Sequence, residues 1–347
     1  MSRRVLSFAL NRKGMGHASR LVAVHAVLRE LGWSSVFFVG HEHRIISDYG
    51  FDQIVIPERT PGDPEATESR KSRIRKAVIR EVLTPGDVIL HDVVVHPELH
   101  ELAAAQDCFQ GYIYRERKDQ ADPVPMIVAA APAIDTIYVL GQDGGTSTRQ
   151  GIRVRGVPDV VREGLGDKSV WVDGDEGLRI VVTAGGGGHP DAQPFLNSAL
   201  SGIARLCAAR AVRASVLAVT GPYFRGTVTV PPSSRVGVRV TPYVGPDHSL
   251  YAGADAVVAQ GGYNTVQELK HNGVRAVTVP GERMLDDQHS RLSALAQRDH
   301  VVVSRPDPAE IGERLSELLD LPQVPSAATG PRAAGAVEIA HDIVQFS

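Results

Sequence analysis

The sequence predicts an α/β protein with two doubly wound domains, and three features support this prediction. Short apolar runs, typical of buried parallel strands, alternate with amphipathic helical stretches along almost the whole chain. A length of 347 residues exceeds one ordinary hydrophobic core and fits two domains of average size. Each half of the chain also contains a strand that is followed by a glycine-rich loop with a histidine, and then by a helix.

The first domain is expected over residues 1–160. Apolar runs predict its strands at residues 4–10, 36–39, 54–56, 88–90, 110–114 and 134–140. Apolar side chains at helical spacing predict helices at residues 18–31 and 97–105. Residues 57–76 are rich in proline, glycine and charge, which is typical of a surface loop that leads into a helix. Residues 141–151 show no periodicity and are expected to be irregular.

A linker is expected near residues 156–175, and the second domain over residues 175–331. Its strands are predicted at residues 179–183, 214–219, 236–240, 256–259 and 276–279, with a short helix between the third and the fourth. Residues 332–347 predict a last amphipathic helix, which we expect to pack back towards the first domain.

The most informative stretch, residues 256–291, predicts a parallel βαβ unit. Gly261 and Gly262 predict the turn after its first strand, and Asn264 or Thr265 is expected to cap the helix that follows. Units of this kind bind ligands beyond the carboxyl ends of their strands. We therefore expect a ligand at this edge.

Three kinds of group are expected there. The amides at the helix N-terminus suit a phosphate. The carboxylate of Glu268 suits the two hydroxyls of a sugar diol, and Asp287 with Gln288 suits several hydroxyls at once. Together these groups describe a binding site for a nucleotide sugar.

A second phosphate-binding element is expected between the first strand and the first helix of the second domain. Four consecutive glycines stand there: Gly185, Gly186, Gly187 and Gly188. Without Cβ atoms, their amides can approach a diphosphate at the positive end of the helix dipole. A plain flexible loop is the alternative, but four glycines cost considerable backbone entropy, so phosphate binding is the preferred interpretation.

The composition restricts the class of protein. A net charge of −3 gives no electrostatic reason to expect a nucleic acid partner. Cys108 and Cys207 form neither a disulfide framework nor a metal-ligand spacing, so a reducing, cytoplasmic location is expected. No cofactor is expected. No apolar run approaches the roughly 20 residues that a membrane-spanning helix needs.

Residues 70–80 are strongly basic, with Ile74 and Val78 on one side. A helix of this kind can lie on a membrane surface or against an anionic substrate. Because no aromatic side chains accompany the basic ones, a solvated helix packed on the first domain is the preferred interpretation. Peripheral membrane contact is the alternative.

The motifs together resemble those of inverting GT-B glycosyltransferases, and most closely the family of the lipid-II-forming N-acetylglucosaminyltransferase, glycosyltransferase family 28. The resemblance covers nearly the whole chain. It implies two Rossmann-like domains facing a central cleft, the donor held mainly by the second, the acceptor entering from the first, and no metal ion. Its motifs are Gly14-x-Gly16-His17, Gly185 to Gly188, Thr241-Pro242-Tyr243-Val244, Gly261-Gly262-x-Asn264-Thr265-x-x-Glu268 and Asp287-Gln288.

The resemblance also implies roles on the donor side. Glu268 would bind the ribose hydroxyls, Asp287 and Gln288 would contact the donor sugar, and Tyr243 and Val244 would flank the base. Each role has an ordinary structural alternative: a surface ion pair for Glu268, a favourable helix start for Asp287 and strand-end packing for Tyr243.

His17 is the candidate general base. It lies at the N-terminus of the first predicted helix, where the positive helix dipole favours the neutral imidazole that a base needs. A capping histidine with a structural hydrogen bond is the alternative. Five residues are expected on the acceptor side of the site: Gly14 and Gly16 in the first loop, His91 and Asp92 after a predicted strand, and Arg115 after another.

The sequence therefore predicts an inverting, metal-independent glycosyltransferase with a nucleotide diphosphate sugar as donor. UDP is favoured because Glu268 suits a ribose with both hydroxyls. One alternative is a nucleotide-sugar hydrolase, which would share the Gly-x-Gly-His-x-x-Arg pattern of residues 14–20 and use water as the acceptor. Another is a non-catalytic partner that binds nucleotide sugar, although such a partner has no need of His17. The sugar, the acceptor and the oligomeric state are not assigned.

Overall fold

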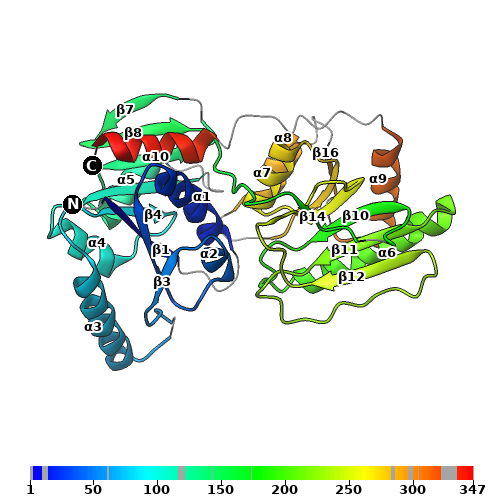
Figure 1. The fold of residues 1–347 in the computed structure, drawn as a ribbon, viewed down its shortest axis with the longest axis horizontal. Helices are drawn as coiled ribbons and strands as arrows, with labels where there is room; N and C mark the ends of the chain where they lie inside the picture. Colours follow the sequence, from blue (N-terminus) through cyan, green and yellow to red (C-terminus); the bar gives the residue numbers. More distant parts are fainter. Residues whose placement is uncertain are drawn as a thin grey trace. The chain divides into compact units, whose positions relative to one another are not determined.

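The structure is a computed structural model. It describes residues 3–9, 15–60, 62–115, 122–142, 144–172, 174–282, 286–295, 300–303, 305–321 and 334–346. The chain packs as two compact units, each an α/β assembly (Figure 1). Unit 1 contains β1 to β8, α1 to α5 and α10, and unit 2 contains β9 to β16 and α6 to α9.

Unit 1 is built on an eight-stranded sheet in the order β3-β2-β1-β4-β5-β6-β8-β7. Its strands are β1 (Arg4–Ala9), β2 (Ser34–Val39), β3 (Asp52–Val55), β4 (Val88–Asp92), β5 (Phe109–Tyr114), β6 (Thr136–Leu140), β7 (Thr146–Arg149) and β8 (Ile152–Val157). All neighbouring strands are parallel except β7 and β8. The strand order reverses between β1 and β4, so ligands are expected beyond the carboxyl ends of these two strands.

The helices of unit 1 are α1 (Gly16–Glu30), α2 (Arg44–Asp48), α3 (Glu65–Val82), α4 (Pro97–Ala104), α5 (Pro123–Ala130) and α10 (Ala334–Phe346). The last helix belongs to this unit although it closes the chain. Its buried Asp342 accepts hydrogen bonds from the Tyr138 hydroxyl at 2.9 Å and from Arg153 Nη1 at 2.8 Å. These bonds fix α10 against β6 and β8.

Unit 2 is built on a six-stranded parallel sheet in the order β12-β11-β10-β14-β15-β16. Its strands are β10 (Leu178–Thr183), β11 (Ala214–Val219), β12 (Val236–Thr241), β14 (Ala256–Gln260), β15 (Ala276–Val279) and β16 (His300–Val302), while β9 (Lys168–Ser169) pairs with β13 (His248–Ser249). Its helices are α6 (Ala192–Arg210), α7 (Tyr263–Asn272), α8 (Gln288–Leu295) and α9 (Pro308–Asp320).

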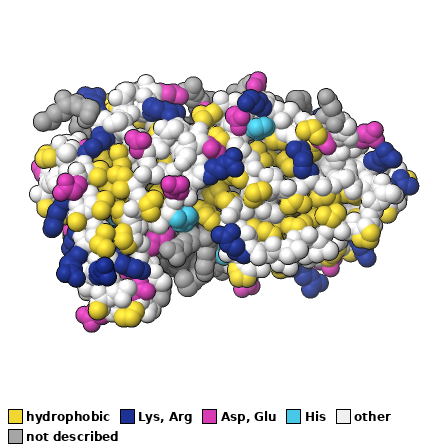
Figure 2. All heavy atoms as spheres, turned by 60° about the horizontal axis from the view of Figure 1, so that its bottom comes forward, with side chains coloured by type: hydrophobic (Ala, Val, Ile, Leu, Met, Phe, Trp, Pro, Cys, Tyr) yellow, Lys and Arg dark blue, Asp and Glu magenta, His cyan; other side chains and the backbone are white. Residues whose placement is uncertain are grey.

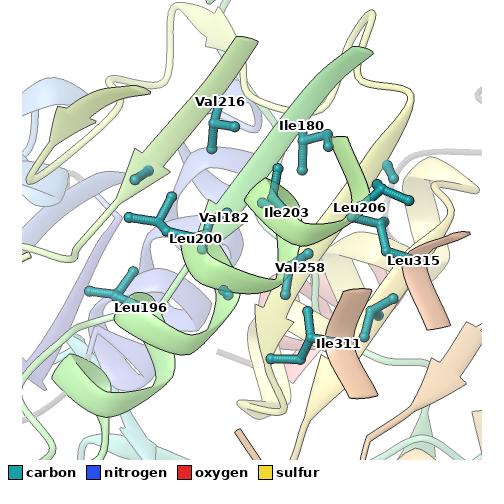
Figure 3. Packing of buried hydrophobic residues seen from close by; sticks show 14 of the residues in the cluster. Ile180, Val182, Leu196, Leu200, Ile203, Leu206, Val216, Val258, Ile311 and Leu315 are labelled. Atoms are coloured by element: carbon teal, nitrogen blue, oxygen red, sulfur yellow. The ribbon is translucent and has the colours of Figure 1, made fainter. Parts of the chain in front are cut away.

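The main core of unit 2 lies between its sheet and the pair α6 and α9. Figure 3 shows Ile180 and Val182 of β10 directed towards Leu200 and Ile203 of α6, with side chains of α9 beside them. Gly202 allows the two helices to approach closely, since a Cβ atom at this position would lie only 2.8 Å from the carbonyl oxygen of Pro308. Burial of this apolar surface, at roughly 25 cal/mol per Å², holds the helices on the sheet that carries the glycine-rich loop.

Residues 141–151 and the segment after β12 differ from the sequence prediction. Residues 141–151 include β7 of a hairpin, whose turn at Gln150 and Gly151 has φ values of 50° and 81°. All four residues of β7 are exposed, so the strand lacks the apolar signal that prediction relies on. The short helix expected after β12 is also wrong, because that segment pairs its backbone with β9, as His248 does with Lys168.

The outer face of α3 carries three exposed arginines, Arg70, Arg73 and Arg80, and the exposed side chain of Ile74. Figure 2 shows Lys and Arg side chains gathered at the lower left of the face in view, where α3 lies. On its inner face, Ile79 packs into the core of unit 1. No helix within the described ranges combines the length and the apolar character needed to cross a membrane.

Candidate active site

A histidine–aspartate pair lies at the switch point of the unit 1 sheet. His17 is the second residue of α1, and Asp92 is the last residue of β4. His17 Nδ1 lies 2.6 Å from Asp92 Oδ2 and 2.8 Å from the Asp92 carbonyl oxygen. Both oxygens are acceptors, so Nδ1 carries the hydrogen and donates it. The neutral ring then has its lone pair on Nε2, which is the form of imidazole that accepts a proton.

Arg20 holds the carboxylate of this pair from the other side. Its Nε donates to Asp92 Oδ1 at 2.9 Å and its Nη2 donates to Oδ2 at 2.7 Å. Burial would raise the pKa of Asp92, but the charge of Arg20 and the contacts with His17 lower it to about 2. The carboxylate is therefore ionised and can stabilise a protonated His17. Arg20 was not among the predicted site residues, although its place three residues after His17, on the same face of α1, was a usable signal.

The other predicted acceptor-side residues lie in different surroundings. His91 is fully buried beside Gln110, whose Oε1 lies 3.2 Å from His91 Nε2, and burial lowers the pKa of His91 to about 4. It points away from Asp92 because successive side chains of a strand alternate between the faces of the sheet. Arg115 follows β5 and is half-buried, Gly16 is the first residue of α1, and Gly14 lies outside the described residues.

The glycine-rich loop of unit 2 follows β10 and turns before α6. Gly185 and Gly187 have φ values of 62° and 73°, a conformation that favours glycine. A Cβ atom at Gly187 would lie 2.1 Å from the Thr220 carbonyl oxygen, so this position admits no side chain. Two of the four amides are used inside the turn, since Gly185 donates to Thr183 Oγ1 and Gly187 to the Ala184 carbonyl.

The other two amides of this loop are open to a ligand. Within the described ranges, the N–H groups of Gly186 and Gly188 meet no acceptor. The start of α7 lies beside the loop, because Thr265 Oγ1 is 3.6 Å from the point where a Cβ of Gly185 would lie. A helix N-terminus and two amides without an acceptor among the described residues lie at the carboxyl edge of one sheet, an arrangement whose partial positive charges suit an anion.

The start of α7 corrects one expectation from the sequence. Asn264 and Thr265 do not cap the helix, because it begins at Tyr263 with Gly262 at the N-cap position. The bend at Gly261 and Gly262 makes this early start possible, and the Gly262 carbonyl already accepts from the Val266 N–H at 3.0 Å. Asn264 and Thr265 therefore lie inside the first turn, and Thr265 Oγ1 is beside Gly185 of the glycine-rich loop.

Glu268 lies farther along α7 and is half-buried. The hydroxyl of Tyr251 donates to Glu268 Oε2 at 3.3 Å, so a buried tyrosine fixes one of its two carboxylate oxygens. Residues 241–244 follow β12 and lie at the carboxyl edge of the unit 2 sheet. There, the Thr241 hydroxyl donates to the Tyr243 carbonyl at 3.0 Å, and Val244 packs against the core beneath α7.

The acid–amide pair at the start of α8 makes contacts within its own segment. Asp287 accepts from the N–H of Ser290 at 3.0 Å and from its hydroxyl at 2.7 Å, as a helix-capping residue does. Gln288 is buried, and its Oε1 accepts from the Gly281 N–H at 2.7 Å. These bonds give both residues a structural role. Their contact with the donor sugar stays a prediction.

Comparisons with known proteins agree with this architecture. Residues 180–341 match the Glycosyltransferase family 28 C-terminal domain. No curated protein matched the sequence. Among solved structures, the spinosyn forosaminyltransferase SpnP has a TM-score of 0.63 at 16% identity, covering 100% of this chain and 96% of its own. MurG of Acinetobacter baumannii has a TM-score of 0.59 at 14% identity, covering 99% and 100%. LpCGTa in complex with UDP has a TM-score of 0.58 at 15% identity, covering 99% and 95%.

Two doubly wound sheets in one chain, each with its loops at the carboxyl edge, define a GT-B fold, as the sequence predicted. The matched domain places the chain among enzymes that transfer sugars. The protein is a GT-B glycosyltransferase similar to glycosyltransferase family 28.

Proposed function

We propose that this glycosyltransferase moves a sugar from a nucleotide diphosphate sugar, with UDP favoured, to an acceptor hydroxyl or amine with inversion and without a metal ion. The observation that carries the proposal is the Nδ1–H of His17 bonded to an ionised, buried carboxylate, with no partner at Nε2 among the residues that the structure describes. In a single displacement, the acceptor atom forms a bond to the anomeric carbon as the bond to the diphosphate breaks. The acceptor proton passes to His17 Nε2.

The donor side of the proposal rests on unit 2. The amides of Gly186 and Gly188 and the N-terminus of α7 would stabilise the negative charge of the departing diphosphate, which supports a reaction that needs no metal ion. Glu268 would accept hydrogen bonds from both ribose hydroxyls, and Tyr243 and Val244 would flank the uracil ring of the nucleotide. LpCGTa in complex with UDP and VinC in complex with dTDP share the fold, which supports a nucleotide diphosphate as part of the donor.

We also propose a cytoplasmic location, because Cys108 and Cys207 are both buried and unbonded, as is usual in a reducing compartment. A nucleic acid partner is not part of the proposal, since the net charge is −3. A solvated α3 remains the preferred interpretation. Because this helix carries exposed arginines, contact with an anionic membrane is the alternative.

The test is a nucleotide-release assay with a panel of UDP-sugars and dTDP-sugars, run with and without candidate acceptors. Donors are first ranked by thermal shift, because a bound ligand raises the melting temperature by mass action. We expect slow release from donor alone and faster release once an acceptor is added. Rapid release that no acceptor accelerates would instead show the hydrolase, with water as the acceptor.

A further inference from the structure

The segment after Asp92 has a backbone conformation that valine rarely adopts. Val93 has a φ of 61°, which crowds any side chain and is a genuine outlier for a β-branched one. The Val94 N–H donates to the Asp92 carbonyl at 2.7 Å, so residues 92–94 form a three-residue turn closed by an i to i+2 hydrogen bond. With a positive φ at its centre, this is the rare and strained form of the γ-turn.

Contacts on both sides hold the turn in this conformation. The Val93 N–H donates to the Ile113 carbonyl at 2.9 Å, and the hydroxyl of Tyr112 donates to the Val93 carbonyl. The ring of Tyr112 is fixed in turn, because it is buried in an apolar cluster of unit 1. Strain of this kind persists only where the surroundings over-determine it, and it often marks a functional site.

The strained turn and the proposed base share one atom. The Asp92 carbonyl oxygen that closes the turn also lies 2.8 Å from His17 Nδ1, and the Asp92 carboxylate lies 2.6 Å from the same nitrogen. A relaxed turn would rotate the peptide group after Asp92 and move that carbonyl away. The ring of His17 would then be held by one acceptor instead of two.

We infer that the turn at Val93, held by the Tyr112 hydroxyl, is a positioning device for the His17–Asp92 pair. Tyr112 is a positioning residue, since it reaches His17 only through Val93 and Asp92. The inference rests on the proposed function, in which His17 is the base. In this inference, the strained turn fixes the orientation of the His17 ring and therefore the direction in which Nε2 faces the acceptor.

The test compares two tyrosine-to-phenylalanine variants that each remove one buried hydroxyl. Tyr112→Phe loses the bond to the Val93 carbonyl, and Tyr138→Phe loses the bond to Asp342 of α10 on the opposite face of the neighbouring strand β6. We expect Tyr112→Phe to lower kcat by about 3- to 10-fold, the worth of one hydrogen bond, with the donor KM unchanged. Tyr138→Phe should leave kcat at the wild-type value while lowering the melting temperature.

A spectroscopic readout needs neither donor nor acceptor. In protein with ¹⁵N-labelled histidine, an Nδ1–H bonded to a carboxylate gives a proton resonance far downfield, which His17→Ala should remove. Tyr112→Phe should shift or broaden this resonance, and Tyr138→Phe should not. Val93→Gly, which adopts this positive φ without strain, should keep the turn and leave the resonance in place.

The outcomes separate the two proposals. If His17→Ala keeps the wild-type kcat, the base assignment in the proposed function is wrong. If His17→Ala loses activity but Tyr112→Phe matches Tyr138→Phe in kcat and in the histidine resonance, the proposed base stands and the positioning role of Tyr112 is overturned.

Discussion

His17 Nδ1 donates a hydrogen bond to the carboxylate of Asp92 at 2.6 Å, although 75 residues separate the two in the chain. The pair forms because β1, which leads into the His17 loop, is the direct neighbour of β4, which ends at Asp92. Parallel strands bring their carboxyl ends to one edge of the sheet, so the two side chains meet there.

The first prediction concerns the base itself. His17→Ala should lower kcat by about 10²–10⁴-fold, the usual contribution of a general base. Donor affinity should remain unchanged, because the proposed donor contacts are all in unit 2. Steady-state rates, donor titration and melting temperature should be measured on the same preparation. A variant that melts early yet keeps its turnover would show that His17 is only a structural capping residue.

Asp92→Asn tests the orientation of the ring. An amide can present its NH₂ group to Nδ1, which would move the ring hydrogen to Nε2 and block proton uptake there. We expect kcat to fall by about 10²-fold or more, together with a loss of stability, because Arg20 keeps a buried charge without its partner. Urea unfolding separates the two effects. Full activity in a destabilised variant would contradict the orienting role.

The stability of the fold should fall as the pH is lowered from 7 to 5. Burial lowers the pKa of His25 to about 3, so the folded chain keeps this ring neutral while the unfolded chain takes up a proton below pH 6.5. The unfolded state binds more protons in this range, so stability rises with pH and is lost on acidification. His25 alone should account for about 2 kcal/mol between pH 7 and pH 5. Unfolding of His25→Gln at both values should show a correspondingly smaller difference.

Glu268→Ala should weaken UDP binding by about 1.5–3 kcal/mol, the worth of hydrogen bonds to a charged group. Tyr251→Phe should weaken it less, because that hydroxyl only fixes one oxygen of the carboxylate. Calorimetric titration with UDP measures both, and Glu317→Ala on the exposed face of α9 is the matched control. Equal affinity in Glu268→Ala and in this control would remove Glu268 from the site.

Two glycines of the same loop should respond differently to alanine. Gly185→Ala should cost about 1–2 kcal/mol of stability, the strain of a left-handed residue, because its Cβ meets only Thr265 Oγ1 at 3.6 Å. Gly187→Ala should cost about 3 kcal/mol or more and abolish nucleotide binding, since its Cβ would collide with the Thr220 backbone. Chemical unfolding and UDP titration check both. Similar losses in the two variants would mean that the loop relaxes freely.

The sequence by itself determined the class of fold and the places of its loops. Apolar runs are a local signal, so the strands around Val5, Val181 and Val257 could be located without knowing their neighbours. The glycines at Gly185 to Gly188 and the histidine after Gly16 also mark their own positions, because a turn without Cβ atoms is a local property of the chain.

Tertiary structure alone decided how these loops are used. The partnership of His17 with Asp92 and Arg20 depends on which strands are neighbours, and strand order has no local signature. The same holds for the segment around His248, whose backbone pairs with Lys168 far along the chain, whereas β7 pairs locally with β8 and lacked a signal because its four residues are exposed. Val93 adopts its strained turn only because Ile113 and Tyr112 of β5 hold it there. No local preference of valine would place it in that conformation.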